Sequence, residues 1–133
     1  LQRMHETIQR IGYQIHTEQH NWVMPNRSLG EFDLVLVDAP CSGTGVVRKH
    51  PEIKWRRTEA DIRALSILQK KIVGNAAKHV RKHGFFAYSV CSVLPEEGRR
   101  IVEQLQWPIV KEWTSFPTSG EEDGFQVYVL QRE

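Results

Sequence analysis

The sequence predicts an α/β fold in which a mainly parallel sheet ends in an antiparallel hairpin. Two apolar runs, residues 32–37 and 85–90, lack the alternation of half-exposed strands and are typical of buried strands. A long amphipathic helical stretch separates them, which favours parallel pairing of the two strands. Two further β-rich segments, 109–113 and 125–130, are spaced as a hairpin at the C-terminal end.

The N-terminal segment carries weaker signals. Met4, Ile8 and Ile11 fall on one face of a predicted helix, and Gly12 is a stop signal for it. Residues 13–17 then form a short candidate strand.

The central part of the chain alternates strand, helix and strand. A polar turn over 26–30 precedes the 32–37 strand, which we expect to be central in the sheet and covered on both faces. Thr58 and Asp61 have the spacing of a helix start, and Gly84 is the predicted end of that helix. The apolar stripe of the helix comprises Ile62, Leu65, Ile72, Ala76 and Val80.

The last third predicts one more helix before the hairpin. Pro95 suits the first turn of a helix whose apolar residues are Ile101, Val102 and Leu105. An acidic connection from Gly120 to Gly124 would then join the two hairpin strands.

Composition is ordinary for a globular protein. The 133 residues can bury one core, and 40% hydrophobic with 26% charged residues is typical of cytosolic proteins. No apolar stretch approaches the roughly 20 residues that span a bilayer, and the first residues show no signal-peptide pattern. We therefore expect a cytoplasmic location and no membrane contact. The two cysteines lack the spacing of a metal site, so no metal is expected.

Positive charge is concentrated in one segment. The net charge is +2, but residues 48–57 alone carry +4, which leaves −2 on the rest of the chain. Such a loop, with an aromatic Trp55, suits contact with phosphates and an unstacked base. A solvated loop whose Trp55 packs on the core is the alternative interpretation. The candidate RNA-binding residues are Arg48, Lys49, Lys54, Trp55 and Arg56.

Each of the two apolar strands is followed by a cysteine motif. Asp38-Ala-Pro-Cys41 follows the first strand, and Cys91 opens a Cys-Ser-Val-Leu-Pro-Glu-Glu segment after the second. The carboxyl ends of parallel strands meet at one edge of a sheet, where open α/β folds build their sites. Two thiols and the Asp38 carboxylate are therefore expected to share one crevice.

These motifs, in this order, resemble the RNA 5-methylcytosine methyltransferases of the Sun/Nop type, in particular those that act on bacterial small-subunit ribosomal RNA. The ordered match runs from Phe32 to Glu97 and returns at Asp123-Gly-Phe125. The resemblance implies the methyltransferase variant of the Rossmann-like fold, S-adenosylmethionine as cofactor and ribosomal RNA as substrate. One departure is Gly98, where the family normally has Asn.

The resemblance also implies that part of the cofactor site lies upstream of Leu1. The Gly-rich cofactor loop and the ribose-binding acid of the family have no counterpart in the sequence. We therefore expect residues 1–133 to be the C-terminal part of one catalytic domain, without an N-terminal RNA-binding domain and inactive alone. Asp38 would lie beside the cofactor, and an acidic position for adenine falls at Gln19. Apolar surface beside 32–37 would then be exposed and would favour self-association.

The family chemistry gives three residues a role. Cytosine C5 is too weakly nucleophilic to attack a methyl sulfonium, so a thiolate first adds to C6. Cys91 is the expected nucleophile, and a helix beginning at Pro95 would favour its thiolate form. Cys41 would assist release of the product. Asp38 would hydrogen-bond the N3 and amino edge of the flipped cytosine.

Other interpretations stay open at this point. Pro40-Cys41 has the form of the nucleophile motif in DNA cytosine-C5 methyltransferases, which would make Cys41 the attacking thiol. The basic loop alone would suit an RNA-binding module without catalysis. A thiol enzyme of another class would need a histidine partner, and no recognisable one is present. Each cysteine by itself is more commonly a small buried hydrophobe, and the pair could form a disulfide on oxidation.

Overall fold

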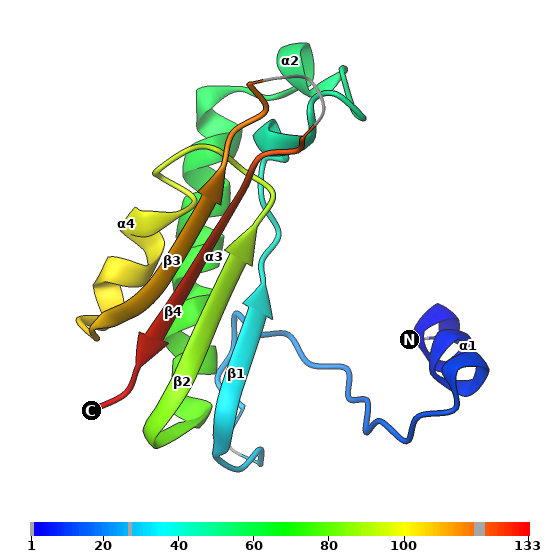
Figure 1. The fold of residues 1–133 in the computed structure, drawn as a ribbon, viewed down its shortest axis with the longest axis vertical. Coiled ribbons are helices and arrows are strands. Elements are labelled where there is room, and N and C mark those ends of the chain that lie inside the picture. The colour runs from blue at the N-terminus through cyan, green and yellow to red at the C-terminus, as the bar shows by residue number, and fades with distance from the viewer. Residues whose placement is uncertain (1, 27, 119–121) are drawn as a thin grey trace.

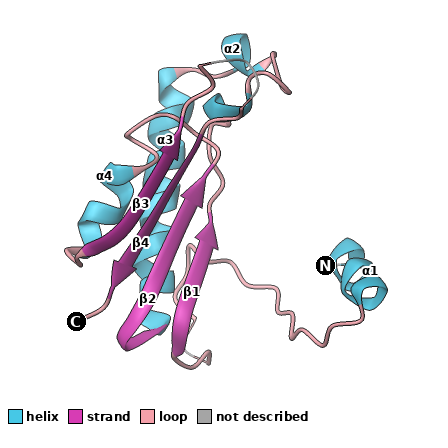
Figure 2. Cartoon of the chain, in the orientation of Figure 1, coloured by secondary structure: helices cyan, strands magenta, loops and turns pink. Residues whose placement is uncertain are grey.

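A computed structural model describes residues 2–26, 28–118 and 122–133, and it contains a four-stranded sheet with the order β1-β2-β4-β3 (Figures 1 and 2). β1 and β2 pair in parallel, while β4 runs antiparallel to both of its neighbours. The predicted α/β class is confirmed, with a mixed sheet made of one parallel pair and the C-terminal hairpin. The strands are β1 (Phe32–Asp38), β2 (Val80–Val90), β3 (Ile109–Ser115) and β4 (Phe125–Gln131).

The helices α3 (Glu59–Ala76) and α4 (Arg99–Val102) pack against the same face of the sheet (Figure 1). Residues of β2 alternate between the two faces, so Phe86 and Tyr88 point into this layer and are fully buried. The other fully buried apolar residues are Val73, Val80, Val90, Ile101, Val102 and Leu130.

The opposite face of β1 is open. β1 lies at the edge of the described sheet, and the side chains of Leu34 and Leu36 are 58% and 65% exposed. The prediction of a central strand covered on both faces is therefore wrong for the described residues, because no helix or strand among them covers this side. The expectation of exposed apolar surface beside 32–37 is confirmed.

The N-terminal helix α1 (Gln2–Ile11) is present as predicted and ends at Gly12. Gly12 has a positive φ of 73°, and its N–H is donated to the Ile8 carbonyl. The candidate strand 13–17 is wrong: these residues form an exposed loop that runs outside the sheet (Figure 1). No described strand lies beside them to accept their backbone hydrogen bonds, and a strand does not form alone.

The loop after residue 17 is anchored to the body by Trp22. Its ring packs edge-on against His79, with centroids 5.6 Å apart. Asn75 of α3 donates its side-chain amide to the carbonyls of Trp22 (3.1 Å) and Val23 (3.0 Å). The predicted polar turn over 26–30 follows, where Asn26 accepts from the backbone N–H of Ser28, and residue 27 lies outside the described residues.

α3 begins as predicted but ends earlier. Thr58 and Asp61 form a capping box in which each side chain bonds the backbone N–H of the other. The predicted end at Gly84 is wrong: α3 stops at Ala76, a short turn η2 (Ala77–His79) follows, and β2 begins at Val80. Val80 does belong to the core, but it reaches the core from a strand that pairs with β1.

The helix predicted to begin at Pro95 starts four residues later. Residues 95–98 form a turn, and α4 begins at Arg99 and runs directly into η3 (Glu103–Leu105). Gly98, the residue before α4, has the non-helical angles φ −109° and ψ −110°, which separates Pro95 from the helix. With no helix end at Pro95, the expected helix-terminus support for the Cys91 thiolate is wrong.

The C-terminal hairpin confirms the prediction and extends it by two residues in β3 and one in β4. Of the acidic connection, Gly120 and Glu121 lie outside the described residues.

Two further short helical segments lie between β1 and α3, namely η1 (Thr44–Val46) and α2 (Ile53–Arg56). Within the described ranges, no helix has both the length and the apolar character needed to cross a membrane.

The capping box of α3 gives a stability prediction. Replacing Thr58 with Ala leaves an N–H of the first turn without its side-chain acceptor, so we expect a loss of about 1 kcal/mol in the free energy of unfolding. Urea denaturation measures this loss. Thr58→Ser keeps a hydroxyl and is the control, and equal losses for both substitutions would contradict the capping role.

Candidate active site

The two cysteines meet at the carboxyl end of β1 and β2. Their Sγ atoms lie 3.2 Å apart although fifty residues separate them in the chain. The register pairs Asp38 with Ser89, so both strands end at the same level, and Ala39 continues the ladder by donating to the Ser89 carbonyl at 3.0 Å. The two thiols therefore meet as the motifs predicted, whereas the cleft that Asp38 lines contains neither cysteine, so a crevice shared by all three groups stays a prediction.

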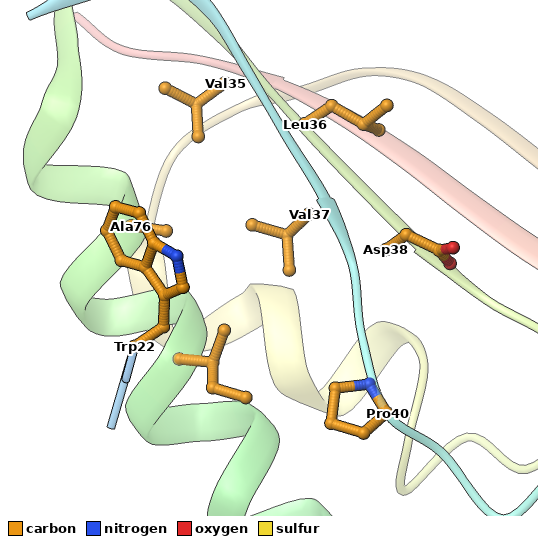
Figure 3. A pocket seen from close by; sticks show the side chains of 8 residues that line it. Trp22, Val35, Leu36, Val37, Asp38, Pro40 and Ala76 are labelled. Carbon is orange, nitrogen blue, oxygen red and sulfur yellow. The ribbon is translucent and has the colours of Figure 1, made fainter. Parts of the chain in front are cut away.

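Asp38 is exposed at the end of β1, beside an apolar cleft of about 280 Å³. Figure 3 shows that Val35 and Val37 point toward Trp22 and α3, whereas Leu36 and Asp38 point to the other side of the strand. The carboxylate therefore marks the rim of the cleft. Its lining comprises Trp22, Val35, Leu36, Val37, Asp38, Pro40, Ile72 and Ala76.

Gln19 does not line this cleft. Its side chain is exposed on the loop that leads from α1 to the sheet, and the residue of that loop that reaches the cleft is Trp22. Sequence reasoning missed Trp22. An isolated large aromatic residue in a polar loop was the signal available for it.

Cys41 is held in its protonated form. Burial, together with the hydrogen bond with Cys91 and the charge of that neighbour, raises the pKa of the Cys41 thiol from 9.0 to about 12. Both cysteines are half-buried and neither forms a disulfide. At neutral pH, Cys41 therefore carries an S–H group in contact with the Cys91 sulfur, and either sulfur can be the donor.

A buried carboxylate joins the two cysteine loops. Glu97 is fully buried and accepts hydrogen bonds from the backbone N–H of Ser42 at 2.8 Å and from the Ser92 hydroxyl at 2.6 Å. It also accepts from the Ser42 hydroxyl and from the side-chain amide of Gln69. Sequence reasoning gave Glu97 no role in the site, although a serine directly after each cysteine was a usable signal.

The Gly-Thr-Gly segment after Cys41 brings three loops together. Gly45 donates its N–H to the Cys91 carbonyl at 3.1 Å and accepts at its own carbonyl from Gly124 at 2.7 Å. A Cβ at Gly45 would lie 1.9 Å from the Gly124 carbonyl oxygen, so only glycine permits this approach. The segment is therefore a structural junction in the described residues.

A side chain at position 98 would collide with Gln126. A Cβ at this position would lie 2.0 Å from the side-chain oxygen of Gln126. The Gln126 amide fills that space and donates to the carbonyls of Ser92 (2.8 Å) and Leu94 (3.0 Å). An amide of β4 thereby supports the turn that follows Cys91.

The basic segment divides into two parts. Arg48 and Lys49 form ion pairs with Asp123, at 3.6 Å for Arg48, and the hydrogen bond from Lys49 holds the pKa of Asp123 below its usual value. Lys54, Trp55 and Arg56 are exposed on α2, and Trp55 is 75% exposed. The interpretation in which Trp55 packs on the core is therefore wrong.

Among the described residues, no three His, Cys, Asp or Glu side chains are grouped so that they could hold a metal ion. Comparison with known proteins identifies the family. The sequence model described as "16S rRNA methyltransferase RsmB/F" matches residues 1–128. The chain belongs to this family.

Curated relatives in the RsmB/F family support the assignment. Ribosomal RNA small subunit methyltransferase B from Shigella sonnei is 43% identical over 100 residues, which cover 74% of this chain and 23% of the relative. The Klebsiella pneumoniae protein of the same name is 40% identical, also over 100 residues that cover 74% of this chain and 23% of the relative. The chain thus spans about a quarter of the length of the curated relatives that it matches.

Solved structures confirm the methyltransferase fold. The crystal structure of PH0851 matches with a TM-score of 0.91 and 25% identity, over 98% of this chain and 34% of that one. NSun6 from Pyrococcus horikoshii, crystallised with SFG, matches with a TM-score of 0.86 and 24% identity, over 98% of this chain and 38% of that one. The fold of the described residues is therefore shared with both of these proteins.

The raised pKa of Cys41 predicts its reactivity. Alkylating reagents attack the thiolate, so at pH 9 we expect Cys41 of the folded chain to react at least about 100-fold more slowly than in urea. Its rate should keep rising above pH 10, because ionisation is displaced to about 12. Iodoacetamide labelling with peptide mapping measures both. A rate that levels off near pH 9 in the folded chain would contradict the prediction.

Proposed function

We propose that this chain carries the two-cysteine centre of an S-adenosylmethionine-dependent ribosomal RNA cytosine-C5 methyltransferase. The observation that carries the proposal is the 3.2 Å contact between Cys41 and Cys91 in a chain of the RsmB/F family. Because the chain spans only about a quarter of its curated relatives, the activity is proposed for a protein that contains the chain, and the chain alone is expected to be inactive. A cytoplasmic location is part of the same proposal.

The raised pKa of Cys41 supports one assignment of the cysteine roles. A thiol whose pKa is raised to about 12 is a poor nucleophile at neutral pH, which favours Cys91 as the group that adds to C6 of cytosine. Asp38 would accept hydrogen bonds from the amino group of the base and from N3 as it becomes protonated. The DNA-type alternative, with attack by Cys41, is less well supported for the same reason.

The release step uses the contact between the two sulfur atoms. A base in the site takes the proton from C5, the electron pair forms the C5–C6 double bond again, and the bond from C6 to the Cys91 sulfur breaks. The departing sulfur gains negative charge, and the Cys41 S–H, 3.2 Å away, can donate a hydrogen bond to it. A module that only binds RNA would have no use for this contact.

The residues at the cleft fit one part of the cofactor. The apolar lining with Trp22 and Ile72 suits a ring or carbon chain, and the Asp38 carboxylate at the rim suits hydroxyl or ammonium donors. When bound, S-adenosylmethionine supplies the methyl group that C5 receives. SFG in the NSun6 structure is an analogue of this cofactor, which supports the proposal. An adenine contact by Gln19 stays a prediction. In the structure the Gln19 side chain is exposed and lies outside the cleft.

The central prediction concerns the two thiols in the full-length enzyme. Cys91→Ala should abolish methyl transfer and any covalent adduct with RNA, because the nucleophile is gone. Cys41→Ala should permit attack and slow release, so that a protein–RNA adduct accumulates. Denaturing electrophoresis with labelled RNA detects the adduct, and trapping by Cys91→Ala instead of Cys41→Ala would reverse the assignment.

A second prediction concerns RNA contact by α2 and the preceding basic residues. In the full-length enzyme, Lys54→Ala or Arg56→Ala should each lower the salt dependence of RNA binding by a slope of about 0.7. Arg48 and Lys49 should act more weakly, because Asp123 already pairs with them. Trp55→Ala should cost about 1 to 3 kcal/mol of binding with little change in slope, through loss of base stacking.

Filter binding over a series of salt concentrations measures these effects. Lys82→Ala is the control, since Lys82 lies at the amino end of β2, away from the cysteine loops. Unchanged affinity after combined substitution of Arg48, Lys54 and Arg56 would assign the segment to solvated surface.

The open face of β1 supports a further proposal, that the isolated chain self-associates. Phe32, Leu34 and Leu36 expose apolar side chains on an edge strand, which favours pairing with another copy. Sedimentation velocity should show concentration-dependent association that Leu36→Lys reduces. A monodisperse monomer at all concentrations would contradict this.

A further inference from the structure

Glu97 is an unusual buried group. Its side chain is fully excluded from solvent, and none of the ion pairs found among the described residues includes it. A buried carboxylate is costly unless donors surround it. Here the donors are two hydroxyls, one backbone N–H and one side-chain amide, from Ser42, Ser92 and Gln69.

The donors come from the two loops that carry the thiols. Ser42 directly follows Cys41, and Ser92 directly follows Cys91. Both hydroxyls donate to the same carboxylate oxygen, Oε2, at 2.5 Å for Ser42 and 2.6 Å for Ser92. One oxygen atom thus sets the separation of the residues next to the two cysteines.

The carboxylate is itself held in place from other elements. The Tyr88 hydroxyl of β2 donates to the Glu97 carbonyl at 2.6 Å. Gln69 of α3 donates to Glu97 at 3.3 Å and to the Pro40 carbonyl, one residue before Cys41, at 2.8 Å. A helix and a strand of the core therefore fix the position of Glu97, and Glu97 in turn accepts hydrogen bonds from both cysteine loops.

We propose that Glu97 is the positioning residue that holds the Cys41 and Cys91 thiols in contact, acting through Ser42 and Ser92. Its importance for catalysis rests on the proposed function, whereas its effect on the thiol spacing does not. Release of the product requires the Cys41 S–H to meet the departing Cys91 sulfur, and a pair held at contact distance needs no reorganisation at that step. Loss of the carboxylate should separate the loops without removing either thiol.

The test measures the thiol spacing without methylation. The chain is equilibrated with reduced and oxidised glutathione, and the fraction of the Cys41–Cys91 disulfide is found by acid quenching and mass spectrometry. Two thiols become one disulfide as one oxidised glutathione becomes two reduced molecules, so the electrons balance. The equilibrium constant reports how closely the folded protein holds the thiols.

We expect Glu97→Gln to lower this constant on the order of tenfold, because an amide cannot accept from both hydroxyls and the Ser42 N–H as the carboxylate does. Glu96→Gln is the matched control: the same substitution one residue earlier affects only an exposed pair with Arg100, and the constant should not change. Ser92→Ala removes a single donor and should give a smaller decrease. This variant keeps the test valid if Glu97→Gln does not fold, as judged by near-ultraviolet circular dichroism.

A folded Glu97→Gln chain with a constant within about twofold of the wild type would overturn the proposal. In the full-length enzyme, Glu97→Gln should lower kcat with little change in the KM for RNA, since the residue acts on the thiols and not on RNA binding. If the disulfide constant falls while Cys91→Ala retains methylation, the positioning role stands and the proposed function fails. If the constant is unchanged while Cys91→Ala is inactive, the reverse holds.

Discussion

The parallel pairing of β1 with β2 is the constraint on which the site depends. It places the ends of two strands, separated by a long helix in the chain, at the same level of the sheet. Each strand then continues into a loop that carries one cysteine, and the two sulfur atoms come into contact. The core positions of β2, with Phe86 and Tyr88 buried against the helices, hold this register because a slip of one residue would turn them to the open face.

Hydrogen bonds to the buried Glu97 carboxylate fix the two cysteine loops relative to each other. Strand ends bring loops near each other, but loops are the most adaptable part of a fold. Glu97 restrains both through the serines that follow the cysteines, and Gly45 adds a backbone bond to the Cys91 carbonyl. The same burial that makes these bonds strong also keeps Cys41 protonated, so the packing and the chemistry of the site have one physical origin.

The contact between Gly45 and Gly124 also places the charges of the basic segment. Asp123 lies just before β4, beside Gly124, which bonds Gly45, and it pairs with Arg48 and Lys49. Lys54, Trp55 and Arg56 lie exposed on α2, and Arg57, directly after α2, donates to the Ser42 carbonyl. The basic segment therefore divides into two parts in the fold, one paired with Asp123 and one exposed.

Local sequence determined the elements whose signals are self-contained. The apolar runs, the capping box at Thr58, the stop at Gly12 and the hairpin each depend on neighbouring residues, and the cysteine motifs determined the family and the meeting of the thiols. Tertiary structure alone decided where α3 ends, whether 13–17 forms a strand and which face of β1 is covered, because these depend on partners distant in the chain. It also decided the role of Glu97, since a carboxylate in a sequence is read as a surface charge until a fold surrounds it with donors from two loops.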